Sequence, residues 1–556
     1  MRFHKTLPRG VALVVLAVVL AACGGGGGGR PQVRALGQTD INPQPRENVR
    51  DGGDLRLPMD LMPSNFNPSQ VDGTTTDAHT VDVAVLPRVF NDGADGSPQL
   101  NTDYVTSATL TSASPQVITY TINPKATWSN GTPITWRDFQ AEWQALNGKN
   151  PEYQIAGATG YSDITSVARG ADDKQAVVTF GQPFGEWQSL FTPLTPASLN
   201  ANPQAFNTAW RTGLPVTAGP FTVQSIDQTK QTVILTRDPK WWGTPPKLDR
   251  IILTVYKTPA LPDALANNEL DEYGIGGELD LLRRAQQTPG AVVRSAPGRT
   301  SFNVTFNGGG GAPLSDEKLR QAVAQAIDRK EITRRMLGQA VPDPEPNGNH
   351  IYAPGSKEYR DNAGVLPYDQ AAASRTLDQL GWVRQGPGRV KDGKPLSLRL
   401  VYSEDPNNTD MAKTIQNELA QIGVTVVLVQ VGANQLFPDY VTPGNFDMAL
   451  MGWQSTSTPF SSGAGIYQQP MGNNVQQNYG RIGSPEIDAL IAKALAELDD
   501  TKRADLANQI DKLIWQEAHS TVLFAVPGIV AVRNNVANFG ARGFADPDFI
   551  NAGFVK

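Results

Sequence analysis

The sequence is poor in the residues that many enzymes and metal proteins use for chemistry. Its 556 residues include one cysteine, Cys23, and four histidines. A single cysteine cannot form an intramolecular disulfide, so the fold must rely on buried apolar surface. The histidines beyond residue 22 are far apart in the sequence, with none of the close spacings typical of zinc sites: His79, His350 and His519. We therefore expect neither a metal nor another cofactor.

Motifs of hydrolases and nucleotide-binding enzymes are also missing. The chain has no G-x-S-x-G, so a secreted hydrolase of the nucleophile-elbow type lacks its motif. Residues 388–394 match G-x-x-x-x-G-K, but Pro395 stands where a phosphate-binding loop has Ser or Thr for magnesium. Asp392-Gly393 is better explained as a hairpin turn. The carboxylates show no pairing of the glycosidase kind, and we expect a protein that is not an enzyme.

The longest apolar run lies at the N-terminus. Residues 11–20 read VALVVLAVVL, and the cations Arg2, Lys5 and Arg9 precede them without any acid. This is the layout of a signal peptide, and it is too short to cross a bilayer, which requires about 20 apolar residues. No second run of spanning length follows, so the remainder is expected to be soluble. Residues 1–22 are therefore predicted to be a signal peptide.

The apolar run ends in Leu-Ala-Ala-Cys, residues 20–23. This stretch resembles the lipobox of bacterial lipoproteins. The small residues allow a peptidase to approach the backbone, and the thiol of Cys23 can accept a diacylglyceryl group through a thioether. The resemblance implies that Cys23 is the lipidation site. A conventional signal peptide beside an unrelated cysteine is the alternative.

A glycine tract follows directly. Residues 24–29 are all glycine, and polar sequence with several prolines continues to Arg50. Because glycine-rich sequence behaves as coil, residues 23–50 are predicted to be a lipidated, Gly-rich tether, with the folded body starting near Gly52. Removing residues 1–22 takes three positive charges from the net charge of −6 and leaves −9. Such an acidic body disfavours nucleic acid or an anionic membrane surface as a partner, so the lipid is the expected membrane contact.

The pattern of apolar residues changes near Phe302. Before it, strand-like alternation dominates, as in Ile118, Tyr120 and Ile122. Beyond it, we expect helices at 315–337, 410–422 and 484–517 (one or two helices) and strands at 396–402, 424–429 and 522–526. The strand, helix and strand between 396 and 429 form a βαβ unit, which favours a mixed or parallel sheet with helices on both faces. The chain is therefore predicted to be an α/β protein with two lobes.

Several stretches, in order along the chain, resemble family 5 of the extracytoplasmic solute-binding proteins, the peptide-binding type that serves ABC importers. The matching stretches are GGDLRL at 52–57, Asn67-Pro68, TINPKATWSNGTPI at 121–134, AGPF at 218–221, RDPKWW at 237–242, LRQAVAQAID at 319–328 and LGW at 380–382. Each is loose alone, but together they cover most of the mature chain. The lipobox agrees with them, because such receptors stay beside a membrane permease.

The resemblance implies a periplasmic-binding-protein-like fold with mixed sheets, in which the ligand is clamped between two lobes. Lobe I would combine residues 51–85, 210–300 and 522–556. Residues 86–209 would form an insertion subdomain of lobe I, and residues 301–521 would form lobe II. Two strand crossovers would then be the hinge.

The resemblance also indicates where a ligand is held. It implies a glycine-threonine loop on lobe I, here Gly73, Thr74 and Thr75, and a Gly-Trp strand on lobe II. The ligand-binding part of that strand is expected to be Gly452, Trp453, Gln454, Ser455 and Thr456. An extended peptide can add to such a strand through backbone hydrogen bonds, with loose side-chain specificity. Core packing is the alternative role for Trp453.

Two positions depart from the family pattern. Peptide binders of this type have Asp three residues after the Trp, where it holds the peptide amino group, and this chain has Thr456. Dipeptide binders use an Arg for the carboxylate, and we align Tyr402 there, followed by the acids Glu404 and Asp405. Tyr402 and Glu404 are therefore also expected to contact the ligand. Without that Asp and Arg, a short peptide with free ends is not expected to bind in the usual way, and a cationic or neutral polar ligand should be preferred.

Two function classes follow from these features. The first is a lipid-anchored, monomeric substrate-binding protein of an ABC importer, on the outer face of the cytoplasmic membrane, which binds a peptide or similar extended polar ligand. The second is a lipoprotein of the same fold that has lost transport and acts as a regulatory or envelope-assembly partner. Thr456 and Tyr402 favour the second class somewhat.

Overall fold

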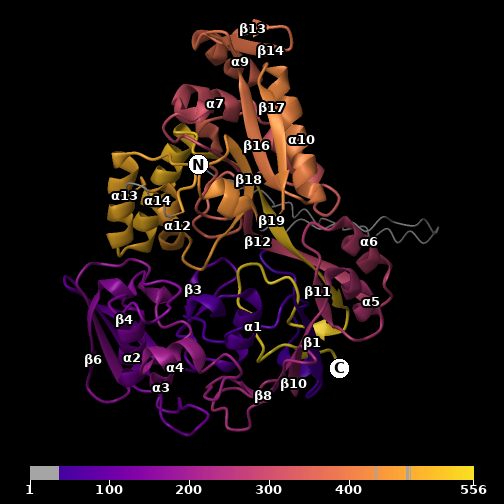
Figure 1. Cartoon of the computed structure of the whole chain (residues 1–556). Helices are drawn as coiled ribbons and strands as arrows, with labels where there is room; N and C mark the ends of the chain where they lie inside the picture. The colour runs from indigo at the N-terminus through magenta and orange to yellow at the C-terminus, as the bar shows by residue number, and fades with distance from the viewer. Residues whose placement is uncertain (1–36, 433–434, 471–474, 476) are drawn as a thin grey trace, which may run out of the picture.

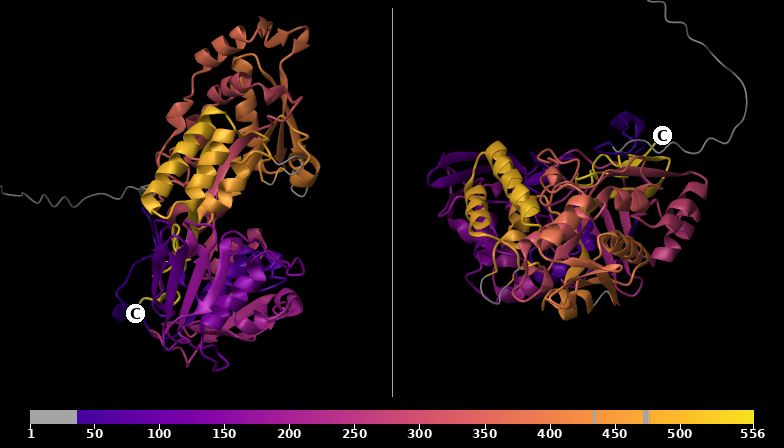
Figure 2. Two further views of the ribbon diagram at one scale, coloured as in Figure 1. Left: turned by 90° about the vertical axis from the view of Figure 1, so that its left-hand side faces the viewer. Right: turned by 90° about the horizontal axis from the view of Figure 1, so that it is seen from above.

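The computed structural model describes residues 37–432, 435–470, 475 and 477–556, which form two lobes, one above the other (Figures 1 and 2). Two long antiparallel strands, β12 (Ala291–Phe306) and β19 (Ser520–Arg533), run through the junction. The boundaries expected at 300 and 522 fall within these strands. The predicted two-lobed α/β fold is confirmed.

The segment before Gly52 is part of the folded body. The backbone nitrogen of Asp40 donates to the oxygen of Ala541 (2.7 Å), and Val49 forms a β-bridge with Val555 and is completely buried. The expectation that the body begins near Gly52 is therefore wrong. The segment before Gly52 is polar and contains prolines, so it shows no local pattern of a folded element. Its hydrogen-bond partners lie near the C-terminus, and the local sequence does not indicate them.

Lobe I contains a four-stranded sheet in the order β1-β10-β9-β8. Its strands are β1 (Asp54–Met59), β10 (Arg250–Val255), β9 (Thr232–Arg237) and β8 (Phe221–Asp227). Side chains alternate along β1: Leu55, Leu57 and Met59 are buried, and the residues between them are half-exposed. Helix α1 (Thr76–Val85) and the short pair β20 (Val536–Ala537) and β21 (Gly553–Phe554) complete this core.

The insertion subdomain has its own sheet (Figure 1), and its buried side chains form a separate core. Its strands, in sheet order, are β4 (Val105–Ala113), β5 (Gln116–Ile122), β7 (Gln175–Phe180) and β6 (Ile164–Arg169), with the separate hairpin β2 (Phe90–Asp92) and β3 (Pro98–Leu100). Its helices are α2 (Trp136–Leu146), α3 (Ala197–Asn200) and α4 (Pro203–Thr208). Sequence alternation missed α2, although Thr135 and Asp138 form a capping box at its start.

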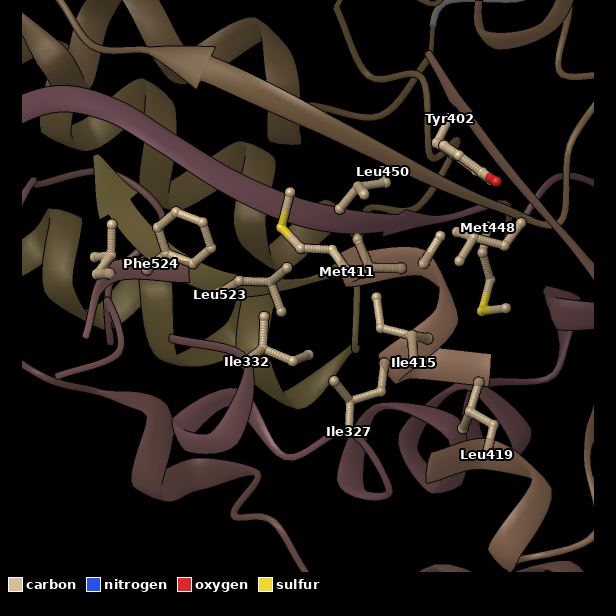
Figure 3. Close-up of a cluster of buried hydrophobic side chains, with 14 of the residues drawn as sticks. Ile327, Ile332, Tyr402, Met411, Ile415, Leu419, Met448, Leu450, Leu523 and Phe524 are labelled. Carbon is tan, nitrogen blue, oxygen red and sulfur yellow. The ribbon is translucent and has the colours of Figure 1, made fainter. Parts of the chain in front are cut away.

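A six-stranded sheet in the order β11-β19-β12-β18-β16-β17 joins the lobes. Its remaining strands are β11 (Glu272–Gly274), β18 (Met448–Gln454), β16 (Ser397–Ser403) and β17 (Thr425–Val431). Helix α10 (Pro406–Gln421) connects the parallel pair β16 and β17, so the predicted βαβ unit is confirmed. Helices α5 (Leu261–Ala266) and α6 (Leu279–Gln287) share the buried cluster of this sheet, part of which Figure 3 shows.

The helix expected at 315–337 is two helices, α7 (Glu317–Gln325) and α8 (Arg329–Leu337). Asp316 caps the first, and the carboxylate of Asp328 accepts a hydrogen bond from the backbone of Glu331 (3.0 Å). Asp328 is thus a second N-cap inside the predicted helix, and a new helix starts there. The apolar periodicity of the segment did not indicate this break.

The other helices of lobe II are α9 (Gln370–Gln379), α12 (Pro459–Tyr467), α13 (Pro485–Ala496) and α14 (Asp500–Gln516). The three-stranded sheet β13 (Val383–Gln385), β14 (Gly388–Lys391) and β15 (Lys394–Pro395) lies at the far end of the lobe (Figure 1). Asp392 and Gly393 both have positive φ between β14 and β15, which confirms the hairpin turn. Within the described ranges, no helix is both long and apolar enough to cross a bilayer.

Candidate functional site

An elongated cavity with two compartments lies at the junction of the lobes. The compartments share the wall residues Arg299, Tyr352, Ala353, Ser455, Thr456 and Pro459. We call the part that also includes Phe90, Ser97, Glu186 and Glu358 the subdomain compartment. The part that also includes Trp453, Gln454, Ser462 and Tyr467 is the strand compartment. The long crossover strands and the loop after β18 place both compartments where the lobes meet.

Strand β18 brings an unpaired backbone edge to this cavity. One edge of β18 pairs with β12 over the whole strand, from Met448 to Gln454. On its other edge, β16 pairs only with Met448 and Ala449. Among the described strands, residues 450–454 therefore have no partner on that side, and their backbone groups can accept an added strand.

The hydrogen-bond pattern shows which residues offer these groups. The backbone nitrogen of Ser455 donates to the oxygen of Arg299 in β12 (2.8 Å). In an antiparallel pair, alternate residues point their N–H and C=O groups to the same side. Trp453 therefore faces β12 with its backbone, whereas Gly452 and Gln454 direct theirs to the unpaired side. Both of the latter residues are exposed.

Glycine at position 452 leaves room on this edge. A Cβ built there would lie 3.5 Å from the Thr300 side chain, an ordinary contact, so nothing in the protein itself requires glycine. Trp453 beside it is half-buried, and its ring stacks on Tyr479 with centroids 5.9 Å apart and planes at 12°. The indole thus packs on one side and lines the strand compartment on the other.

Thr456 lies at the boundary of both compartments. Its hydroxyl donates to Oγ of Ser462 (2.8 Å) and accepts from the backbone nitrogen of Thr458 (3.2 Å). The side chain is exposed and organises the turn that leads into α12. The residue at position 456 is therefore neutral, faces the cavity, and carries no charge for a ligand amine.

An ion pair occupies the hinge side of the subdomain compartment. The guanidinium of Arg299 donates to Asp92 (2.8 Å) and to the backbone oxygen of Phe544 (2.7 Å), and it lies 5.2 Å from the Phe544 ring centre. The register of β12 against β19 is irregular between Ala296 and Thr300, and a Cβ on the neighbouring Gly298 would lie only 2.0 Å from the Val526 oxygen. Burial and the neighbouring Asp546 raise the pKa of Asp92.

Along the outer edge of the cavity, four hydrogen bonds between described residues connect the lobes. The Gly185 nitrogen donates to the Leu495 oxygen (2.8 Å), and the Lys357 nitrogen donates to the Asp95 oxygen (3.1 Å). Arg503 donates to the Gly185 oxygen (3.0 Å). The carboxylate of Glu186 accepts from the Ser461 nitrogen (2.9 Å), and burial raises its pKa. The structure is therefore a form in which the insertion subdomain contacts lobe II.

The glycine-threonine loop is placed elsewhere. A Cβ on Gly73 would lie 1.9 Å from the Asn67 oxygen, so glycine is needed for close backbone packing. The Thr74 hydroxyl donates to the Val71 oxygen (3.3 Å), and Thr75 is the N-cap of α1. None of the three lines either compartment, and their contacts here stabilise the loop and the helix start.

Tyr402 and Glu404 are not brought together with β18. Tyr402 is 3% exposed and belongs to the buried cluster of lobe II (Figure 3). Glu404 is exposed and lines a separate shallow depression with Asp405, which caps α10. The structure therefore groups Trp453, Gln454, Ser455 and Thr456 in the cavity wall, with Gly452 next to them on β18. The other predicted residues lie outside the cavity: Gly73, Thr74, Thr75, Tyr402 and Glu404.

The sequence reasoning missed much of the charged wall. Arg299, Glu186 and Glu358 come from a hinge strand and two loops, far apart in the chain. No local motif marks them, and only the packing of three segments brings them to one cavity. The Pro-Gly-Arg sequence at 297–299 is the one signal that could have suggested an irregular point in a hinge strand.

Comparisons with known proteins agree on one family. The model of the bacterial extracellular solute-binding proteins, family 5 (middle part), matches residues 98–474. The chain is 44% identical to the oligopeptide-binding protein OppA of Mycobacterium tuberculosis over 526 residues, which cover 94% of this chain and 88% of that protein. It is 27% identical to the probable monoacyl phosphatidylinositol tetramannoside-binding protein LpqW of the same species, over 74% of this chain and 69% of LpqW.

A solved structure supports the fold over nearly the whole chain. The periplasmic EDTA-binding protein EppA superimposes with a TM-score of 0.85 at 26% sequence identity. The match covers 94% of this chain and 100% of that structure.

Proposed function

This chain belongs to family 5 of the bacterial extracellular solute-binding proteins, and we propose that it binds an extended peptide between its lobes and delivers it to an ABC importer. The observation that carries the proposal is the unpaired edge of β18 in the wall of the interlobe cavity. Gly452 and Gln454 supply the backbone groups, and Trp453 supplies apolar contact area beside them. The 44% identical relative is an oligopeptide-binding protein.

In this proposal the protein binds by lobe closure and performs no chemistry. A peptide that lies along residues 450–454 touches the crossover strands and the loop after β18, and both lobes then enclose it. Ligand binding favours the closed form because the ligand contacts both lobes only in that form. Backbone pairing depends little on side chains, which suits a receptor for many sequences. We propose that the protein acts as a monomer with its permease.

Alternate backbone methylation tests the strand pairing directly. We expect N-methylation at every second peptide nitrogen of Ala-Ser-Ala-Ser-Ala to weaken binding about tenfold or more, because each blocked position loses a hydrogen bond worth about 1 kcal/mol and adds a steric conflict. Methylation at the intervening nitrogens should have little effect, since these point away from β18. Isothermal titration calorimetry on the two isomeric sets measures the difference.

The two methylated sets control for each other, because they have the same composition and the same number of methyl groups. Equal losses for both sets would contradict strand addition and indicate recognition through side chains or termini. Absence of binding by the unmodified peptide, at concentrations up to several millimolar, would contradict the peptide ligand itself.

We also propose that a lipid on Cys23 holds the mature protein at the outer face of the cytoplasmic membrane. We expect Cys23→Ala to leave the precursor unprocessed or to release the processed protein into the soluble fraction. Two or three acyl chains, at about 0.8 kcal/mol per buried CH₂, hold a protein firmly, whereas the acidic body offers no comparable attraction. Fractionation of salt-washed membranes, with intact-mass analysis of the N-terminus, measures both effects.

Ser484→Ala in the same expression system is a suitable control for handling losses, since Ser484 is the N-cap of α13, away from the anchor. A processed Cys23→Ala protein that stays with washed membranes would show that another contact holds it.

A second candidate function is a lipoprotein of this fold that serves a regulatory or envelope-assembly partner instead of transport. Two observations favour it: the neutral residue at position 456 and the similarity to LpqW, whose name describes a glycolipid-binding protein. Native mass spectrometry of protein purified without refolding separates the two candidates. A co-purified peptide supports transport, and a co-purified glycolipid or protein supports the second function.

A further inference from the structure

The subdomain compartment contains hydroxyl groups that form no hydrogen bond with any described residue of the protein. Tyr352 is only 4% exposed, yet its hydroxyl makes no hydrogen bond with any described residue, and Tyr352 lines the cavity. Nearby in the same loop, the hydroxyl of Ser356 is buried and has no hydrogen-bond partner among the residues that the structure describes. A hydroxyl that is buried and unbonded, as that of Ser356 is, costs free energy unless something occupies the site beside it.

The two arginines of the wall, Arg299 and Arg503, already form ion pairs within the protein. Arg299 is paired with Asp92. Arg503 donates to Asp500 (2.6 Å) and to two backbone oxygens, those of Gly185 and Glu497. Neither guanidinium is therefore available for a ligand carboxylate without breaking bonds inside the protein.

Two carboxylates of the wall form no salt bridge within the described residues, although the charge of Arg503 partly opposes the rise that burial causes in the pKa of Glu186. Glu186 accepts one backbone hydrogen bond, from Ser461, and forms no ion pair within the described part of the chain. Glu358 has neither an ion pair nor a side-chain hydrogen bond to another described residue. Burial raises the pKa of Glu358 despite the adjacent Lys357, whose side chain is exposed. Glu186, Glu358 and Tyr352 line the same compartment. Burial raises the pKa of Tyr352, and the charges of the two carboxylates raise it further.

We infer that this corner, formed by Glu186, Glu358 and Tyr352, binds an ammonium or guanidinium group of the ligand, with Glu358 as the main charge partner. The inference rests on the proposed function, because it assumes a ligand that lies along β18. The strand ends at Gln454, and the chain continues through Ser455 and Thr456 into the wall of this same corner. A peptide that extends past the end of β18 therefore brings either its terminal amine or a basic side chain to the two glutamates.

This assignment explains how the site can lack a carboxylate at position 456. The negative charge comes from Glu358 on the 352–360 loop and from Glu186 on the insertion subdomain. Because Glu186 belongs to lobe I and Glu358 to lobe II, a bound cation touches both lobes only when they are closed. Recognition of the cation would then also stabilise the closed form.

Substitution of Glu358 by Gln tests the inference with three peptides. They are Ala-Ser-Ala-Ser-Ala, its N-acetylated form, and the N-acetylated form with Lys as the first residue. We expect E358Q to weaken the free-amine peptide, the lysine peptide or both about five- to tenfold in calorimetry, and to leave the neutral acetylated peptide unchanged. E404Q is the matched control, because it removes the same charge from an exposed site of lobe II outside the cavity.

The three arms identify the source of the cation. Loss for the free-amine peptide alone assigns the corner to the terminal amine, and loss for the lysine peptide alone assigns it to a basic side chain. Equal effects of E358Q on all three peptides, or no effect on any, would overturn the inference while leaving peptide binding intact. If wild-type protein binds no peptide, the proposed function fails, and calorimetric titration with spermidine then tests the corner by itself. Binding heat with wild type that disappears in E358Q supports the inference. Absence of binding heat with both proteins, or the same heat with both, overturns it.

Discussion

Gly185→Ala is expected to weaken peptide binding by about 10- to 100-fold. A Cβ at this position would lie 2.2 Å from the backbone oxygen of Glu497 in lobe II and 2.9 Å from a guanidinium nitrogen of Arg503. Neither partner is the free end of a flexible chain, because Arg503 also bonds to the oxygens of Gly185 and Glu497. Overpacking of this kind typically costs about 1–3 kcal/mol, and each 1.4 kcal/mol changes an affinity tenfold.

The cost falls only on the form in which the lobes touch. Gly185 has no positive φ, so alanine fits its backbone when the lobes are apart. The substitution should therefore shift the equilibrium towards the open form and leave the thermal stability of each lobe nearly unchanged. Small-angle scattering should show a smaller radius of gyration when wild-type protein is saturated with Ala-Ser-Ala-Ser-Ala, and this decrease should be reduced in G185A.

Gly157→Ala is the matched control, since it lies in the same subdomain, has no positive φ, and has open space around the built Cβ. If G185A binds the peptide as tightly as wild type and compacts equally, the contact at Gly185 does not take part in closure. A wild-type protein that binds the peptide without any change in scattering would contradict the closure mechanism itself.

The parts of the fold that could be predicted are those in which the local pattern and the tertiary role agree. Strand β16, helix α10 and strand β17 follow one another with clear periodicities, and the turn at Gly423 has the positive φ that glycine allows. The predicted helix nevertheless started late: α10 begins at Pro406, where Asp405 caps it. Pro at the first helical position and Asp before it are start signals, and the apolar stripe alone did not contain them.

Elements whose stability comes from distant partners could not be predicted. Residues 40–50 carry no strand pattern, yet hydrogen bonds across nearly the whole chain hold them, such as that from Asn42 to Val536 (2.9 Å). The break between α7 and α8 likewise depends on the side chain of Asp328. Such choices are made by tertiary contacts, for which a single sequence holds no periodic signal.

In the candidate site, too, residues in a local motif could be predicted, and residues brought together only by tertiary packing could not. Residues 453–456 are contiguous, so a motif resemblance is enough to place them, and they do line the cavity. Tyr402 lies near the end of β16, where Leu400, Val401 and Tyr402 are all buried, and its side chain packs into the core instead of reaching the junction. Glu186 and Glu358 could not be selected from the many acids of the sequence, because their proximity arises only when the insertion subdomain meets lobe II.

Thr456→Asp is expected to strengthen binding of peptides with a free amino terminus about tenfold. The side chain at 456 faces both compartments, and a carboxylate there can keep the local turn by accepting from the Thr458 nitrogen and the Ser462 hydroxyl, as the Thr oxygen now does for Thr458. The start of α12, close by, also favours a negative charge. A charge-assisted hydrogen bond to an ammonium group is worth about 1.5–3 kcal/mol, which exceeds the 1.4 kcal/mol of a tenfold change.

The measurement is calorimetry with Ala-Ser-Ala-Ser-Ala and its acetylated form on wild type, T456D and T456N. The Asn variant keeps the shape and hydrogen-bonding capacity of Asp without its charge, so it should not distinguish the two peptides more than wild type does. T456D in the E358Q background should restore the preference for the free amine that E358Q removes, because either carboxylate can then serve the same ammonium group. A T456D protein that gains equally for both peptides, or for neither, would show that the amino terminus of the ligand does not reach position 456.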